Sequence, residues 1–230
     1  MKFVKAETNG NDFVIINSES SFEIDVLKKI SDRRFGIGCD QIIIVNKIAS
    51  KKYDVRFYNQ DGSSANMCGN GSCAVSKYIK KILQNDEDNI ELIISGSYYE
   101  TKIFEDESVS IKFPKPKNLD KNIISTGNKH MICDMDMTNI AEEIQKENPD
   151  CNIHFIEKIN HNSIRIKTFE RGVGWTLACG SGAIAVGFYS NINGEIEIIH
   201  DGGKSLVTIQ KDSAILKTNP NIIFEGTFYD

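Results

Sequence analysis

The sequence predicts a mixed α/β protein that consists of two duplicated halves. The pattern C-G-x-G-x-x-A-V-x-x-Y occurs at residues 68–78 and again at residues 179–189, a spacing of 179 − 68 = 111 in a chain of 230 residues. Around each copy, short apolar runs typical of strands alternate with helix-like segments. A proline-rich stretch at residues 114–118 separates the copies and is typical of a connection between domains. We therefore expect two similar halves, each with one motif cysteine.

The first half is predicted to begin with a hairpin. Two apolar runs within residues 2–17 flank Thr8–Asp12, whose Asn, Gly and Asp residues favour a turn. The apolar spacing at residues 25–31 indicates a short helix, and the first motif begins a longer helix. The remaining elements are strands, expected at residues 41–45, 53–58, 90–95 and 108–113.

The second half is predicted to repeat this order. Residues 125–132 correspond to residues 8–15 at a spacing of 117, and a helix at residues 137–147 and a strand at residues 163–169 precede the second motif. The last strand, near residues 221–229, is expected to cross back to the first half. The expected domains are residues 1–116, completed by residues 219–230, and residues 117–218.

Composition and charge exclude several classes of protein. Apolar residues make up 40% and charged residues 26% of the chain, which is ordinary for a globular protein. The net charge of −5 and the scattered lysines provide no basic surface, so we expect no nucleic-acid partner. The sequence has no apolar run of the roughly 18 residues that span a bilayer, and its N-terminus lacks the pattern of a signal peptide. We expect a cytoplasmic protein without a membrane partner, in which the six cysteines are free thiols.

The two motif cysteines, Cys68 and Cys179, are the candidate catalytic residues. A thiol at the start of a helix lies beside unpaired N–H groups and the positive end of the helix dipole, which favour the thiolate. The glycines that follow let the backbone approach a ligand, so that N–H groups can bind a carboxylate or a phosphate. If the two halves face each other, one thiolate can remove a proton from a carbon while the other thiol protonates the opposite face. This chemistry is that of a two-base racemase or epimerase and requires no cofactor.

Other interpretations of the cysteines and histidines remain open. A single C-G-x-G indicates a tight turn or a buried cysteine as readily as a catalytic one, and it is the repeat that favours catalysis. Cys68 and Cys73 are alternatively a redox or metal-binding pair, but C-x4-C is not a typical zinc spacing, and we expect no metal. His154, His161 and His200 have no motif around them. The cysteines expected in the core are Cys39, Cys133 and Cys151.

Further motifs are spread over nearly the whole chain. They are Gly10–Phe13, Asp32-Arg33 with Gly36–Gln41, Asn59–Ser63, Met67–Gly71, Gly127–His130, Asn152-Ile153 and Glu170–Gly182. In this order they resemble the diaminopimelate epimerases, a family of pyridoxal-independent enzymes that interconvert LL- and meso-diaminopimelate. The reaction that the resemblance implies belongs to the biosynthesis of lysine and of peptidoglycan precursors.

This resemblance implies two pseudosymmetric domains, each a β-sheet or barrel wrapped around a central helix, with the active site between them. Cys68 and Cys179 correspond to the family's base and acid, and no cofactor is implied. The expected partner is a small-molecule amino acid, and a homodimer remains open. The implied substrate-binding residues are Asn11, Gln41, Asn59, Gly69, Asn70, Asn128, Asn152, Glu170, Arg171, Gly180 and Ser181.

These residues divide by the part of the substrate that they would bind. Backbone N–H groups at Gly69-Asn70 and at Gly180-Ser181 would hold the carboxylate at the reacting carbon. In the alternative interpretation, the remaining polar residues are turn asparagines and a surface ion pair. The residues that the resemblance assigns to the distal amino-acid group are Asn59, Asn128, Asn152, Glu170 and Arg171.

The chain departs from the family pattern at several positions. Glu7-Thr8-Asn9 stands where the family usually has His-Gly-Leu, and Ser72-Cys73-Ala74 stands where it has Ala-Arg-Cys. Trp175 replaces a glutamate, Lys129 a proline and His154 a glycine. These changes bear on the identity of the substrate more than on the type of reaction.

Four hypotheses about function follow from the sequence. The first is diaminopimelate epimerase activity, and the second is racemisation of another amino acid, such as histidine, on the same fold. The third is a redox or metal-binding protein, in which Cys68 and Cys73 would react with each other. The fourth is a non-catalytic module that binds amino acids and exchanges no α-proton.

Overall fold

The computed structural model describes residues 1–229. The chain forms two compact units, which we call unit 1 and unit 2. Unit 1 consists of Met1–Ile111 together with the segment from Asn219 onward, and unit 2 consists of Lys112–Thr218. Within residues 1–229, no helix has the length and apolar character needed to cross a membrane.

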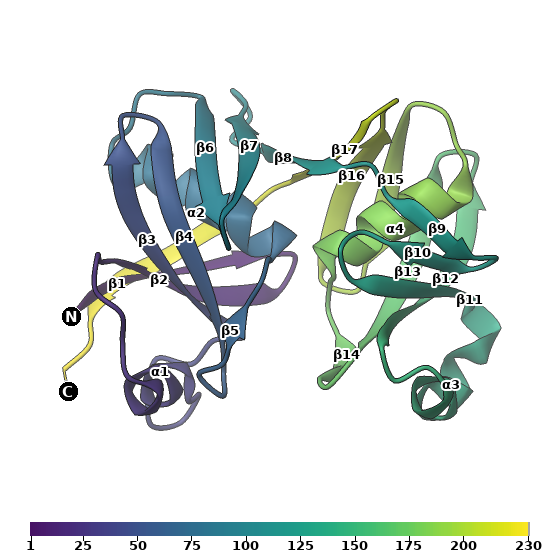
Figure 1. Ribbon diagram of the computed structural model, residues 1–230, viewed down its shortest axis with the longest axis horizontal. Coiled ribbons are helices and arrows are strands. Elements are labelled where there is room, and N and C mark those ends of the chain that lie inside the picture. The colour runs from purple at the N-terminus through teal and green to yellow at the C-terminus, as the bar shows by residue number, and fades with distance from the viewer. Residues whose placement is uncertain (230) are drawn as a thin grey trace. The chain divides into compact units, whose positions relative to one another are not determined.

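Unit 1 begins with an antiparallel hairpin and is completed by a strand from the C-terminal segment (Figure 1). In chain order, its elements are β1 (Lys2–Thr8), β2 (Asn11–Asn17), α1 (Ile24–Ser31), β3 (Gln41–Ala49), β4 (Lys52–Asn59), β5 (Ser64–Ala65), α2 (Gly69–Lys81), β6 (Asn89–Ile94), β7 (Ser97–Ile103), β8 (Val109–Pro114) and β18 (Asn221–Thr227). The last of these, β18, pairs antiparallel with β1, and the Met1 amino group donates a 2.7 Å hydrogen bond to the carbonyl of Phe228.

Unit 2 has the same kinds of element in a corresponding order. They are β9 (Lys117–Asp120), β10 (Ile123–Ser125), β11 (Lys129–Asp134), the 3-10 helix η1 (Met135–Ile140), α3 (Ala141–Glu147), β12 (Cys151–Asn160), β13 (Ser163–Glu170), β14 (Gly174–Thr176), α4 (Gly180–Ser190), β15 (Glu195–His200), β16 (Gly203–Ile209) and β17 (Ser213–Thr218).

The pattern of strand pairing is repeated in the two units. In unit 1, β2 runs parallel to β3, β3 antiparallel to β4, and β4 parallel to β6. In unit 2, β11 runs parallel to β12, β12 antiparallel to β13, and β13 parallel to β15. The strands β6, β7 and β8 then continue antiparallel, as do β15, β16 and β17. The duplication seen in the motifs therefore extends to the order and direction of the strands.

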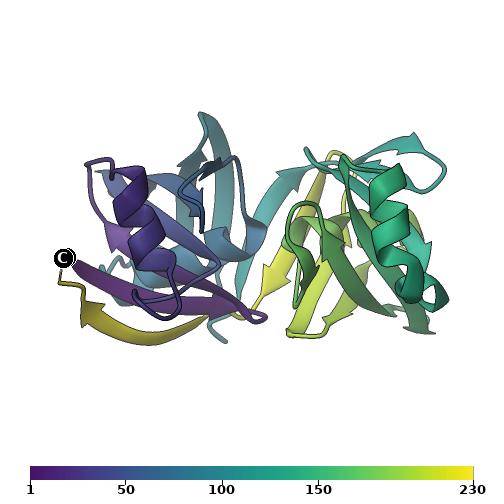
Figure 2. The ribbon, with the colours of Figure 1, turned by 90° about the horizontal axis from the view of Figure 1, so that it is seen from below.

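The sheet of each unit surrounds one central helix, α2 in unit 1 and α4 in unit 2 (Figure 1). Figure 2 shows the shorter helix of each unit, α1 or α3, on the side of that unit that faces the viewer. Contacts reach α2 from β1, β2, β3, β7 and β18, and reach α4 from β10, β11, β12, β15, β16 and β17. Val75 and Ile79 of α2 and Ile184 and Val186 of α4 are completely buried. A helix enclosed in this way needs small or apolar residues on nearly all sides, and both motifs supply them. The predicted fold class, with a sheet around a central helix in each half, is confirmed.

A shorter helix in each unit makes the crossover between two parallel strands. In unit 1, α1 packs its buried residues Leu27 and Ile30 against the core beside β3. In unit 2, the expectation of one helix over residues 137–147 is wrong in detail, because residues 135–140 form the 3-10 helix η1 and the α-helix begins at Ala141. Thr138 and Asn139 lie in this stretch, and their polar side chains compete for backbone hydrogen bonds and disfavour an α-helix.

Candidate active site

The first motif cysteine, Cys68, is the N-cap residue of α2. Its backbone is extended, with φ −136° and ψ 114°, so that the helix begins at Gly69. Its Sγ accepts a hydrogen bond from the backbone N–H of Gly71, with sulfur and nitrogen 3.3 Å apart. The sulfur thus has the position that a serine or aspartate oxygen usually occupies in an N-cap, beside the positive end of the helix dipole.

The second motif cysteine, Cys179, caps α4 in the same way. Its backbone has φ −131° and ψ 113°, and its Sγ accepts from the backbone N–H of Gly182 at 3.4 Å. The hydroxyl of Ser181 lies 3.5 Å from the same sulfur. Each unit therefore presents a thiol at the N-terminus of its central helix in nearly identical geometry.

The N–H groups next to these thiols are suited to bind an anion. The first N–H groups of a helix have no acceptor within that helix, and they project outward beyond its N-terminus, where an anion can bind. In α2 these groups belong to Gly69 and Asn70, and in α4 to Gly180 and Ser181. They are the groups that the sequence assigns to the carboxylate at the reacting carbon.

The second glycine of each C-G-x-G motif is a glycine because of packing. A Cβ atom on Gly71 would lie 2.7 Å from the ring of Phe57, and one on Gly182 would lie 2.1 Å from the ring of His154. The expectation that the glycines let a ligand approach therefore does not explain Gly71 and Gly182, which keep the central helix in contact with aromatic rings of the surrounding sheet.

Asn11 lies beside the thiol of Cys68. The sulfur donates to the Asn11 side-chain oxygen at 3.7 Å, and the Asn11 amide donates to Asp40 at 2.8 Å. Asp40 in turn accepts from Arg33 at 2.8 Å. This chain of contacts orients Asn11 with its oxygen toward the sulfur.

Asp12 is the centre of an ion-pair cluster behind Asn11. Its carboxylate contacts Lys5 at 2.6 Å and Arg33 at 2.7 Å. Burial alone would raise the pKa of Asp12, but hydrogen bonds from Arg33 and Lys5 lower it to about 2. The charged cluster fixes the start of β2, the strand on which Asn11 lies.

Two more predicted residues of unit 1, Gln41 and Asn59, contact each other. They lie opposite in the register of β3 and β4, and the Gln41 amide donates to the Asn59 side-chain oxygen at 3.1 Å. Asn70 is 2% exposed, and its carbonyl accepts from the Thr8 hydroxyl at 3.1 Å. Within residues 1–229, Gln41 Oε1 and Asn70 Oδ1 are buried without a hydrogen-bond partner.

In unit 2, three predicted residues meet at the turn after β13. The backbone N–H of Arg171 donates to the Asn152 side-chain oxygen at 3.1 Å, and the Thr176 hydroxyl donates to Glu170 at 2.8 Å. The side chain of Arg171 is exposed. Asn128 lies in the β10–β11 turn, where its carbonyl accepts from the N–H of Thr126 at 3.0 Å. The structure thus brings Asn152, near the start of β12, beside Glu170 at the end of β13 and Arg171 in the loop that follows it.

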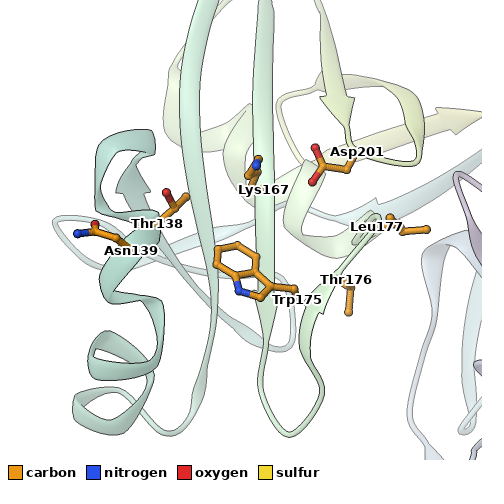
Figure 3. A pocket seen from close by; sticks show the side chains of 7 residues that line it. All are labelled: Thr138, Asn139, Lys167, Trp175, Thr176, Leu177 and Asp201. Atoms are coloured by element: carbon orange, nitrogen blue, oxygen red, sulfur yellow. The ribbon is translucent and has the colours of Figure 1, made fainter.

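A pocket of about 510 Å³ lies next to this loop in unit 2 (Figure 3). Trp175 packs against Phe155 and Phe169, with ring centroids 5.7 Å and 5.3 Å apart, and remains 51% exposed. Figure 3 shows its indole between Thr138 and Asn139 on one side and Leu177 and Asp201 on the other. The aromatic ring that replaces the family's glutamate is therefore part of a pocket wall, together with Thr138, Asn139, Lys167, Thr176, Leu177 and Asp201.

A histidine pair beside Cys179 escaped prediction from the sequence. His130 of β11 and His154 of β12 are both completely buried, and His130 Nδ1 lies 2.8 Å from His154 Nε2. Burial lowers the pKa of His130 to about 4 and that of His154 well below its usual range. One sign of this pair is present in the sequence, because His154 stands where the family that the chain resembles usually has glycine. His154 is a core residue and belongs to a buried polar cluster.

Two other departures from the family pattern have structural partners. Glu7 accepts from the backbone N–H of Gly10 at 2.9 Å and also from the side chain of Asn221. Lys129 forms an ion pair with Asp150 at 3.5 Å. Glu7 thus links the β1–β2 turn to β18.

Cys39, Cys133 and Cys151 were expected in the core. Cys39 and Cys151 are buried, as is Cys73, whereas Cys133 is partly exposed. All six cysteines are free thiols in the structure.

Solved structures share this fold at low sequence identity. A predicted epimerase from Pseudomonas aeruginosa has a TM-score of 0.78 at 8% identity, and the match covers 100% of this chain and 99% of the other. A hydroxyproline epimerase from Agrobacterium vitis, with bound trans-4-hydroxy-L-proline, has a TM-score of 0.73 at 9% identity and covers 98% and 91%. The fold is therefore that of the epimerase- and racemase-like α/β proteins.

Sequence comparison identifies the family within this class. The family profile described as "Diaminopimelate epimerase" matches residues 3–117. A diaminopimelate epimerase from Clostridium perfringens is 32% identical, with 99% of each chain covered, and one from Methanococcus aeolicus is 27% identical, with 100% of this chain and 99% of the relative covered. The chain belongs to the diaminopimelate epimerase family and is an isomerase.

Proposed function

We propose that this isomerase inverts the α-carbon of diaminopimelate, interconverting the LL and meso forms, with Cys68 and Cys179 as its two acid–base groups. The observation that carries the proposal is the matched capping geometry of the two thiols. Each sulfur accepts from the backbone N–H of the third residue after it, at 3.3 Å in α2 and 3.4 Å in α4. Two equivalent thiols are what an inversion requires, because each direction of the reaction needs a base on one face and an acid on the other.

The proposed chemical step is a pair of proton transfers. One sulfur, as thiolate, takes the α-proton, and the electron pair of the broken C–H bond moves toward the carboxylate. The other sulfur, as thiol, then delivers its proton to the opposite face of the α-carbon. N–H groups of Gly69, Asn70, Gly180 and Ser181 would bind the carboxylate and stabilise the negative charge that develops on it.

The distal amino-acid group of the substrate would be held by polar and charged side chains. In unit 2, the cluster of Asn152, Glu170 and Arg171 combines a carbonyl-type acceptor, a carboxylate and a guanidinium. Arginine suits a second carboxylate because it donates two parallel hydrogen bonds, and glutamate suits an ammonium group. Asn128 of unit 2 and Asn59 of unit 1 complete the proposed set for the distal group. Two further proposed residues support this site: Asn11 contacts the thiol of Cys68, and Gln41 donates to the side chain of Asn59.

A racemase of another amino acid is the second candidate, and Trp175 is the observation that favours it. The indole forms part of a pocket wall at the position of a family glutamate, 51% exposed. An apolar surface in place of a carboxylate favours a substrate with a different side chain. A protein of the same fold is named a hydroxyproline epimerase, so the fold accommodates substrates other than a diacid.

A redox function through Cys68 and Cys73 finds less support. Cys73 is completely buried, and its thiol donates to the carbonyl of Val109 at 3.8 Å. Burial, with a smaller effect of Cys68, raises the pKa of Cys73 well above its usual range, so this cysteine remains a protonated thiol. A protonated, buried thiol is a poor partner for disulfide exchange.

Proton NMR in D2O tests the proposed function. The reduced protein is incubated separately with LL-diaminopimelate, histidine, glutamate and proline, and the α-proton signal and the appearance of the second stereoisomer are followed. Exchange and inversion of diaminopimelate alone are expected. Exchange of another amino acid alone would replace the substrate but retain the two-thiol mechanism, and the absence of exchange with all four would contradict the proposal. A confirmed reaction would be one of the steps that supply lysine and peptidoglycan precursors, expected in the cytoplasm.

A further inference from the structure

Three potential metal ligands come together in the interior of unit 2. They are His130 on β11, His154 on β12 and Cys179 at the N-cap of α4. His130 Nδ1 and His154 Nε2 are 2.8 Å apart, and one ring nitrogen of each histidine and the Cys179 sulfur all lie within 4.8 Å of one another. Both histidines are 0% exposed, and Cys179 is 7% exposed. The cluster is therefore compact and largely shielded from water.

The outer nitrogen of each ring is held by a threonine. His130 Nε2 lies 2.9 Å from the Thr126 hydroxyl, and His154 Nδ1 lies 3.1 Å from the Thr168 hydroxyl. A hydroxyl can accept a ring N–H, and in metal sites such a partner directs the lone pair of the other ring nitrogen toward the metal. When both outer nitrogens carry a proton that a threonine accepts, the two inner nitrogens, which face each other, become available as ligands.

Packing also holds the cluster against the start of α4. A Cβ atom at Gly182 would lie 2.1 Å from His154, so the ring lies directly against the turn that carries the Cys179 cap. The ring of His154 fills the space that a glycine at position 154 would leave open, and it brings a ring nitrogen close to the thiol of Cys179. The arrangement comes from the strand pairing, since His130 and His154 lie on adjacent parallel strands, with His130 in register with Asn152.

We propose that His130, His154 and Cys179 form a binding site for a divalent transition metal of the zinc type. Two imidazoles and one thiolate are the ligands that Zn²⁺ prefers, and three protein ligands with one open position are common in zinc sites. Tetrahedral bonds of about 2.0–2.3 Å place ligand atoms about 3.3–3.6 Å apart. The inner nitrogens must therefore separate by about half an ångström, and the sulfur must approach them, which rotation of the side chains can supply.

Protons balance without a redox step. In the free cluster, one inner ring nitrogen carries the proton of the histidine–histidine hydrogen bond. On binding, that proton moves to the outer nitrogen of the same ring, where threonine accepts it, and the Cys179 thiol loses its proton to solvent as the sulfur–metal bond forms. The net exchange is one metal ion bound and one proton released, and neither sulfur nor metal changes oxidation state.

Metal binding would have a consequence for the proposed reaction. A sulfur bonded to a metal ion cannot deliver or receive the α-proton, so the metal-bound form would be inactive. This consequence rests on the proposed function, whereas the binding of the metal does not.

Titration of the reduced protein with Co²⁺, followed by competition with Zn²⁺, tests the site. Bound Co²⁺ reports thiolate ligation by a charge-transfer band and four-coordination by intense visible bands. We expect one Co²⁺ per chain, displaced by Zn²⁺. His154→Gln and His154→Gly should each weaken binding at least tenfold, and Cys179→Ser should abolish the charge-transfer band.

Two control variants lie outside the cluster. His161→Ala removes an exposed histidine, and Cys151→Ala removes another thiol of unit 2. Both should bind Co²⁺ like the wild type. Binding of Co²⁺ that persists in Cys179→Ser with the same band, or that is unaffected by both His154 variants, would overturn the proposal. Circular dichroism establishes that each variant is folded.

The proposals of a metal site and of the enzymatic function are tested by separate measurements. Co²⁺ binding is measured without an amino acid, and α-proton exchange is measured in the presence of a chelator. Exchange without Co²⁺ binding would retain the function and reject the site, and Co²⁺ binding without exchange would do the reverse.

Discussion

At the scale of single residues, the ion pairs of Asp12 couple the stability of unit 1 to pH. Its carboxylate contacts Lys5 and Arg33, and its pKa is lowered from 3.8 to about 2. A pKa lowered by folding stabilises the protein above the unfolded value, and this contribution is lost as the pH falls from about 4 toward 2. The shift corresponds to about 2 kcal/mol. We expect Asp12→Asn to lower the unfolding free energy at pH 7 by about this amount and by less at pH 3, as measured by urea unfolding.

The matched control for Asp12 is Asp136→Asn. Asp136 is exposed and lies in the 3-10 helix of unit 2. Its replacement should leave the pH dependence of unfolding unchanged. An Asp12→Asn variant with the same pH dependence as the wild type would show that the ion-pair cluster does not stabilise the fold.

Arg171 carries a second prediction at the residue scale. Its backbone is held by Asn152 while its side chain is exposed, so substitution of the side chain should preserve the loop. We expect Arg171→Lys to raise KM for diaminopimelate by about tenfold, because lysine cannot donate the two parallel hydrogen bonds that fit a carboxylate. Steady-state kinetics measures the effect, with kcat changing less than KM.

Arg165→Lys is the control for the replacement of an arginine by a lysine. Arg165 lies on β13, the strand that ends just before Arg171, and pairs with Glu157 at 2.7 Å on an exposed surface. Its kinetics should match the wild type. An unchanged KM in Arg171→Lys would mean that another group binds the distal carboxylate.

At the scale of elements, the contact between α4 and β12 depends on the pairing of Gly182 with His154. A Cβ atom at Gly182 would lie 2.1 Å from the His154 ring, which is completely buried. We expect Gly182→Ala to destabilise the protein by about 1–3 kcal/mol through overpacking. Urea unfolding measures the loss.

The double variant Gly182→Ala/His154→Gly provides the control. Removal of the ring opens space for the added methyl group, so alanine at position 182 should cost less in the His154→Gly background. A coupling of more than about 0.5 kcal/mol between the two substitutions is expected. Strict additivity would argue against a direct contact between the ring and the helix.

The elements around the thiols were only partly predictable from the sequence. The C-G-x-G pattern predicted a cysteine at the start of each helix, because glycines and a following apolar run mark a helix N-terminus locally. The packing role of Gly71 and Gly182 was not predictable, since the rings that they contact come from β4 and β12, distant in the sequence. The cluster of His130 and His154 was missed for the same reason, because it arises from parallel pairing of β11 and β12.

At the scale of the whole molecule, the duplication allowed the fold class to be predicted. Two copies of the C-G-x-G-x-x-A-V-x-x-Y motif imply two copies of a fold. The two units indeed have the same order and direction of strands. The exact strand limits and the 3-10 helix η1 depended on packing between distant segments and on local competition for hydrogen bonds, which periodicity does not report. The resemblance of many motifs, not any single one, indicated the family to which the chain belongs.

The duplication also leads to the central claim, that two equivalent thiols act on one substrate. The most direct measurement compares the rates of diaminopimelate inversion by Cys68→Ser, Cys179→Ser and Cys73→Ser, followed by NMR with reduced, chelator-treated protein. We expect each of the first two variants to lose at least about a hundredfold in rate, because a serine hydroxyl is a far weaker acid and base for this proton transfer. Cys73→Ser, which changes a buried thiol outside the proposed site, should retain inversion. Inversion at the wild-type rate by Cys68→Ser or by Cys179→Ser would contradict the two-thiol mechanism.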